Sequence, residues 1–132
     1  MEISWTMPIK TVSEANSSEH WAKKASRHKQ QQYFTNLFFQ RAVKEFSLPC
    51  EITLTRLSPR TLDNDNLLSS LKYIRDEIAA CLLPELKVTY VSKGKLIESK
   101  GFCDNDPRIS WKYDQQKSKL YGVNVKISNK IL

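Results

Sequence analysis

The sequence predicts a single small α+β domain (residues 1–132), in which a mixed or antiparallel sheet carries two main helices. The chain has 132 residues, the length of one domain, and its 40% of hydrophobic residues can build one modest core. Several short segments alternate polar and apolar residues, as strands do, and two longer segments show helical periodicity. These segments are interleaved along the chain without internal repeats, which indicates helices packed on a sheet.

The first half of the chain predicts a strand, a long helix and a second strand. Residues 3–9 have the pattern of a short strand. Residues 20–46 contain no proline or glycine, and apolar residues recur at every fourth position, which predicts one helix with an apolar stripe. The stripe consists of Phe34, Phe38, Ala42 and Phe46. Residues 51–57 alternate, as expected for a strand with one buried face.

The second half predicts another helix, a hairpin and two closing strands. Residues 65–82 form the helix, which stops before a proline. Residues 84–101 resemble a hairpin inserted into the domain; its lysines can follow DNA, but we favour a decorative role. Residues 108–113 and 121–127 alternate again, and we expect them to be antiparallel neighbours.

The cysteines argue against a zinc site. Cys50, Cys81 and Cys103 are widely spaced without a CxxC pair, and only His20 and His28 can supplement them. Free thiols of this kind are typical of a reducing compartment. The first residues also lack the features of a secretion signal, and no apolar run is long enough to cross a membrane. We therefore expect a cytoplasmic protein, nucleoid-associated when bound to DNA, that makes no membrane contact.

The net charge of +7 favours an anionic partner. Nucleic acid is the commonest such partner of a small basic domain, although charge alone is weak evidence unless the cations cluster. A cluster occurs at the start of the first predicted helix. We expect DNA to contact Lys23, Lys24, Arg27 and Lys29, together with Arg60 beside the acidic loop described next. The alternative is that these charges merely solvate a helix end.

An acidic pair, Asp63 and Asp65, stands where a strand leads into the second predicted helix. Two carboxylates this close repel each other unless a cation lies between them, and Mg²⁺ binds to a few carboxylates plus waters and phosphate oxygens. The alternative is helix capping, in which Asp63 or Asn64 accepts backbone N–H groups. In one continuous helix, Lys72 would lie two turns along the same face as Asp65, where it can approach a bound phosphate.

A second acidic loop, Asp104-Asn105-Asp106, precedes the strand that begins near Ile109. If the fold brings the two loops together, three or four carboxylates converge on an otherwise positive surface. That pattern is typical of a metal-dependent nuclease, in which cations attract DNA and carboxylates hold the metal.

These motifs resemble the RusA family of Holliday-junction resolvases, particularly its phage-type members. Asp63-Asn64-Asp65-Asn66 matches the D-x-D-N motif of the family, and Asp106 matches its later aspartate. Residues 71–79 resemble the lysine-bearing helix, and residues 107–113 and 121–125 resemble the closing strands. In the best-known members the lysine follows the second aspartate by four residues; here Ser69 occupies that position, so Lys72 is assigned its role.

The resemblance implies a Mg²⁺-dependent, structure-specific endodeoxyribonuclease that resolves four-way DNA junctions as a homodimer. It implies that Asp63, Asp65 and Asp106 hold the metal, for which Mn²⁺ can substitute, that Asp104 is an outer-shell partner and that Lys72 assists catalysis. No organic cofactor is implied. The alternatives are a non-catalytic DNA-binding protein of the same fold, or a metal-dependent phosphoesterase that acts on other substrates.

Overall fold

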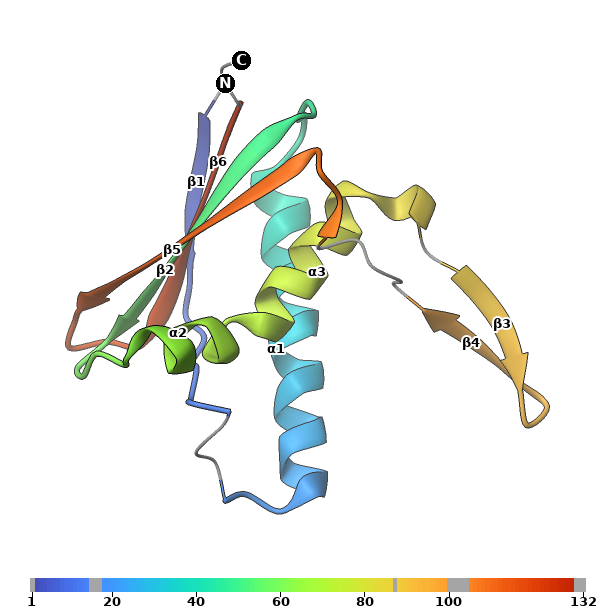
Figure 1. Ribbon diagram of the computed structural model, residues 1–132, viewed down its shortest axis with the longest axis horizontal. Helices are drawn as coiled ribbons and strands as arrows, with labels where there is room; N and C mark the ends of the chain where they lie inside the picture. Colours follow the sequence, from blue (N-terminus) through green and yellow to red (C-terminus); the bar gives the residue numbers. More distant parts are fainter. Residues whose placement is uncertain (1, 15–17, 87, 100–104, 130–132) are drawn as a thin grey trace.

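The computed structural model describes residues 2–14, 18–86, 88–99 and 105–129, and it has an α+β fold (Figure 1). A four-stranded mixed sheet has the order β1-β6-β2-β5, and three helices lie on one of its faces. The elements are β1 (Glu2–Met7), α1 (Trp21–Ala42), β2 (Cys50–Ser58), α2 (Asn64–Ser70), α3 (Lys72–Leu82), the 3₁₀ turn η1 (Pro84–Leu86), β3 (Val88–Ser92), β4 (Lys95–Ser99), β5 (Ile109–Lys117) and β6 (Gly122–Asn129).

The strand order differs from the predicted one. Strand β6 pairs antiparallel with both β1 and β2, and β5 pairs with β2 in parallel, from Cys50↔Ile109 to Ser58↔Lys117. The expectation that β5 and β6 are antiparallel neighbours is therefore wrong, because β2 lies between them. A parallel pair needs a long crossover, and the helices and the hairpin between β2 and β5 provide it.

The core lies between the sheet and the helices. Strand β2 alternates as predicted, with Ile52 and Leu54 buried on the face toward the helices. Ile74 and Ile78 of α3 are buried in the same cluster, as is Val125 of β6. The apolar face of α3 therefore covers the middle strands, which fixes the position of the helix pair α2–α3 on the sheet.

The buried line of α1 is not the predicted phenylalanine stripe. Gln31, Thr35 and Phe39 are buried. Of the predicted stripe, Phe38 and Ala42 are partly buried against the core, Phe34 is exposed, and Phe46 is exposed beyond the end of α1. The Thr35 hydroxyl donates a hydrogen bond to the Gln31 carbonyl at 2.6 Å, which satisfies a buried polar group within the helix. Hydrophobic periodicity does not reveal such a line, because two of its three members are polar.

The second predicted helix is two helices, α2 and α3, which change direction at Leu71 (Figure 1). The hydroxyls of Ser69 and Ser70 donate to the carbonyls of Asn66 and Leu67, three residues earlier. Adjacent serines that bond back to the backbone in this way favour a helix kink. Leu71 then closes the first helix with an N–H bond to Leu68.

The predicted hairpin is present as β3 and β4, which form a separate two-stranded sheet that projects from the body (Figure 1). Val91 and Leu96 are paired across it, and both are exposed. Lys93 and Lys95 are exposed beside the turn at Gly94, whereas Lys100 lies outside the described residues. None of the described helices has the length and hydropathy needed to cross a membrane.

Candidate functional site

The acidic pair lies beyond the carboxyl end of β2, at the start of α2. Asp63 is the N-cap of α2, and its Oδ1 accepts the N–H of Asn66 at 2.9 Å. Asp65 is exposed in the first turn and has no hydrogen-bond or ion-pair partner among the described side chains. The expected capping by Asp63 is therefore present, and it uses one oxygen of one carboxylate. The other three carboxylate oxygens of the pair remain available.

Two sets of hydrogen bonds fix the backbone around this pair. Just before it, the side chain of Gln115 in β5 accepts the Leu62 N–H at 2.8 Å and donates to the Leu62 carbonyl at 2.7 Å. Just after it, the Ser13 hydroxyl donates to Oδ1 of Asn66 at 2.5 Å. The acidic pair thus lies between the carboxyl end of β5 and the loop that follows β1.

The side chain of Arg56 cross-links the loop after β1 and the loop after β2. Its buried guanidinium donates to the hydroxyl and carbonyl of Thr11 and to the carbonyl of Arg60 at 2.9 to 3.3 Å. Burial lowers the pKa of this guanidinium, and the charge of Tyr121 partly offsets the change. The loop after β1 and the loop after β2 are therefore held together by one side chain, close to the acidic pair.

Asp106 lies at the other end of the sheet. It precedes Ile109, which pairs with the first residue of β2. Asp63 lies at the opposite end, because its neighbour Leu62 is bonded to Gln115 near the end of β5. The six residue-to-residue steps from Ile109 to Gln115 span about 20 Å in an extended strand. Ligands of one Mg²⁺ lie about 2 Å from the ion. The expectation that a single chain joins Asp106 to Asp63 and Asp65 is therefore wrong, because the parallel pairing of β2 and β5 separates their loops.

Asp106 is also engaged locally. Its Oδ1 accepts the backbone N–H and the Nε–H of Arg108, both at 2.9 Å, and its Oδ2 accepts from the same guanidinium at 3.0 Å. The Arg108 hydrogen bonds lower the pKa of the Asp106 carboxyl. Arg108 also reaches Glu85 at 3.4 Å. Asp106 therefore acts here as a structural anion at the start of β5; Asp104 lies outside the described residues.

Lys72 does not share a helical face with Asp65, because α2 ends at Ser70 and Lys72 begins α3. Its Nζ lies 5.4 Å from the centroid of the Tyr73 ring, within cation–π range. Ser69, for which Lys72 was expected to substitute, donates its hydroxyl to the Asn66 carbonyl of its own helix.

The predicted DNA-binding cations differ in their surroundings. Lys23 and Lys29 are exposed on α1 and Arg60 is exposed after β2, whereas Lys24 is half-buried. Arg27 binds Glu14 and, at 2.7 Å, Glu19. These ion pairs fix the loop before α1, and the contact of Arg27 with DNA stays a prediction.

A cluster that was not expected from the sequence joins this loop to α1 and α3. Oε2 of Glu14 lies 3.1 Å from Nε2 of His28, and the His28 ring stacks on Tyr73 with centroids 3.7 Å apart. Burial raises the pKa of Glu14, but hydrogen bonds and charges from Arg27 and His28 outweigh it, so the pKa is lowered. No sequence signal links these three segments, because only the fold brings them together.

Several cations at the carboxyl end of β2 were also not expected from the sequence. Lys117 and Lys119 are exposed where β5 ends, and Lys10 is exposed in the loop after β1, with its Nζ 4.7 Å from the Tyr121 ring centroid. Together with Arg60 they place positive charge at the end of the sheet where the acidic pair lies. Their signal was the +7 net charge, but their positions in the sequence are scattered.

Within the part of the chain that the structure describes, no three or more His, Cys, Asp or Glu side chains gather to hold a metal ion. No protein-family model, curated protein or solved structure matches this chain. The site must therefore be interpreted from its own chemistry.

Proposed function

We propose that the protein is a Mg²⁺-dependent endodeoxyribonuclease that cuts branched DNA, with four-way junctions as its substrate. The observation that carries the proposal is the pair Asp63 and Asp65, which is exposed and without a described cationic partner at an end of the sheet rich in exposed lysine and arginine. A cationic surface attracts the DNA backbone, and an anionic spot within it suits a divalent ion.

The residues present fit Mg²⁺ as two carboxylate ligands. Mg²⁺ commonly takes one or two protein carboxylates and completes its shell with water and phosphate oxygens. Asp63 offers the oxygen that does not cap α2, and Asp65 offers both. A metal ion held there supplies a water of lowered pKa and neutralises charge on the phosphate. The lysine predicted to assist, Lys72, would have to approach the phosphate from the start of α3.

If Asp106 is a third ligand, it has to come from a second copy of the chain. Asp106 lies about 20 Å from the acidic pair along β5, so one chain cannot bring them together. A two-fold axis perpendicular to the strands makes the two protomers antiparallel, so opposite ends of the two sheets can lie side by side. In the homodimer that we propose, Asp106 of one protomer would give up its hydrogen bonds to Arg108 and bind the metal ion at the acidic pair of the other protomer.

The first experiment compares Asp65→Asn with Glu45→Gln. Glu45 is exposed between α1 and β2, before β2 begins, so the control removes the same charge at the end of the sheet opposite the acidic pair. We expect Mg²⁺-dependent nicking of a four-way junction to be lost in Asp65→Asn and retained in Glu45→Gln, with junction binding retained in both. Equal nicking by the wild type and Asp65→Asn would refute the assignment.

The second experiment tests the shared site by mixing subunits. Asp65→Asn and Asp106→Asn are each inactive alone if both residues serve one metal. In a mixed dimer, one site combines the intact Asp65 of one subunit with the intact Asp106 of the other, so nicking returns. If Asp106→Asn is fully active, or if the mixture stays inactive after subunit exchange, Asp106 has no place at the metal.

A DNA-binding protein that does not cut is the second candidate. It is favoured by the capping role of Asp63 and by the Arg108 partner of Asp106, which give both carboxylates structural uses. A wild-type protein that binds junctions but nicks none of several branched substrates in Mg²⁺ or Mn²⁺ would establish this alternative. A preference for linear duplex or nucleotides would instead indicate another phosphoesterase.

A further inference from the structure

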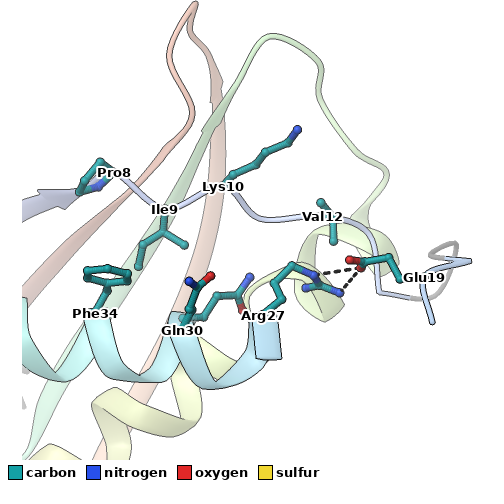
Figure 2. A pocket seen from close by; sticks show the side chains of 9 residues that line it. Pro8, Ile9, Lys10, Val12, Glu19, Arg27, Gln30 and Phe34 are labelled. Carbon is teal, nitrogen blue, oxygen red and sulfur yellow. Dashed lines mark hydrogen bonds and ion pairs between the residues drawn. The ribbon is translucent and has the colours of Figure 1, made fainter. Parts of the chain in front are cut away.

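A cavity of about 380 Å³ lies between the loop that follows β1 and the N-terminal half of α1. Figure 2 shows Pro8 and Ile9 on one side and the Phe34 ring on the other, with Arg27 and Glu19 joined at one end. Apolar walls with a few polar groups in a space of this size are typical of sites for small organic groups. The cavity is separate from the acidic pair, and the proposed function does not use it.

Gln31 supplies the feature that points to a ligand. Its side chain lines the cavity, the residue is only 2% exposed, and neither Nε2 nor Oε1 has a hydrogen-bond partner among the described residues. Buried polar atoms almost always have partners, because leaving them unpaired costs free energy of folding. Both atoms lie beneath the cavity wall, so the amide has to rotate toward the cavity, where a group that presents an acceptor beside a donor would satisfy both atoms at once.

Two further residues restrict the kind of ligand. The Phe34 ring is 41% exposed and also lines a second hollow on the C-terminal side of the cavity, so it is accessible for stacking. Lys10 lines the cavity and has no carboxylate partner among the described residues, unlike Arg27, which is neutralised by two. A ligand that used all three residues would be flat, would carry a paired donor and acceptor, and would be attached to an anion.

We propose that this cavity binds an unstacked nucleobase of the DNA. Gln31 would pair with the edge of the base, as glutamine does with the N6 donor and N7 acceptor of adenine, Phe34 would stack on its face, and Lys10 would contact its phosphate. The inference rests on the proposed action on DNA and adds a base-binding pocket to it. Branched DNA offers bases that unstack at low cost.

The position of the cavity agrees with this role. Its loop is tied to the acidic pair by the Ser13–Asn66 hydrogen bond and by the bonds that Arg56 makes to Thr11 and Arg60. A strand that places one base in the cavity can therefore continue toward Asp63 and Asp65 over the same end of the sheet.

The test measures anisotropy of a short labelled single-stranded oligodeoxyadenylate in EDTA, which removes any contribution from a metal. The same oligonucleotide with abasic residues is the reference probe. The variants are Gln31→Leu and Phe34→Ala, and the control is Gln40→Leu, the same change at an exposed site of α1 outside the cavity. Removing one base contact is expected to weaken binding about tenfold.

We expect the wild type and Gln40→Leu to prefer the probe with bases, and both cavity variants to lose that preference. Gln31→Leu should also unfold at a temperature equal to or above that of the wild type, because it removes an unpaired buried amide. A purely structural glutamine would give the opposite shift. If the wild type binds both probes equally, or if Phe34→Ala and Gln31→Leu keep the preference, the proposal is overturned.

Junction nicking separates this proposal from the proposed function. A wild type that nicks junctions in Mg²⁺ without preferring bases refutes only the base pocket. A wild type that prefers bases but nicks no branched DNA refutes only the nuclease. Asp65→Asn should lose nicking and keep the preference for bases.

Discussion

Asp63 has two roles that substitution can separate. Asp63→Ala removes both the carboxylate and the N-cap, whereas Asp63→Asn keeps an oxygen that can accept the Asn66 N–H. Loss of the cap costs about 1 kcal/mol, which lowers the melting temperature by about 3–5 °C for a chain of this size. A carboxylate centred about 3 Å from Mg²⁺ contributes about 2.8 kcal/mol in water, so its loss weakens metal binding about a hundredfold.

The assay is thermal unfolding with and without Mg²⁺, followed by junction nicking. Without metal, Asp63→Asn should melt with the wild type and Asp63→Ala several degrees lower. If the wild-type Kd for Mg²⁺ is about 1 mM, 10 mM Mg²⁺ adds about 1.4 kcal/mol of stability, and neither variant should gain it. The reasoning fails if Mg²⁺ does not stabilise the wild type and Asp63→Asn nicks DNA at the wild-type rate. Asp63 would then be a cap alone.

Four further predictions follow from single contacts. Glu14→Gln should be less stable than the wild type at pH 7, because it removes the carboxylate that pairs with Arg27. Thermal unfolding at successive pH values should show this difference in stability vanish as the pH falls below 4.5 and through the lowered pKa of the folded Glu14. Protonation of the carboxylate then breaks the same pairing. Gly122→Ala places a Cβ 3.1 Å from a backbone carbonyl of β1 and should cost about 1–2 kcal/mol in urea unfolding; an unchanged midpoint would contradict the close approach. Burial raises the pKa of the Cys50 thiol, so mass spectrometry should find it unmodified by maleimide until the protein unfolds. Arg60→Gln should reduce the slope of log affinity against log salt by about 0.9 for junction DNA, and an unchanged slope would place Arg60 off the DNA.

The sequence predicted the elements of the fold better than their pairing. Alternation in residues 51–57 and 121–127 and the length of the long helix were sufficient for an α+β domain, because these patterns follow from local geometry. The neighbours of a strand depend on the path of the whole chain, and residues 108–113 turned out to lie parallel to β2. That one pairing also decides the site, since it sends Asp106 to the end of the sheet opposite Asp63.

The candidate site was predictable in its local part only. Asp63 and Asp65 are separated by one residue in the sequence, so their proximity in space could be predicted without tertiary information. Lys72 was placed beside them by assuming an unbroken helix, and the serine pair that bends the chain at Leu71 invalidated that assumption. The burial of Gln31 could not be predicted, because a polar residue between polar neighbours has no pattern that indicates a buried position. Only the packed structure shows that its amide has no hydrogen-bond partner among the described residues.

Net charge also gave an incomplete guide to the DNA-facing surface, because the arginines and lysines of this chain have different uses. Arg27, Arg56 and Arg108 make several hydrogen bonds each within the chain, and Arg75 lies over the Trp111 ring with its guanidinium carbon 4.9 Å from the centroid. A planar guanidinium with five donors suits such cross-links, whereas a lysine ammonium on a flexible stem remains solvated. The cations left for DNA are therefore mostly lysines, which bind phosphates as point charges without reading bases. If the protein distinguishes one DNA position from another, that selectivity has to come from elsewhere, and the unpaired amide of Gln31 is a group able to supply it.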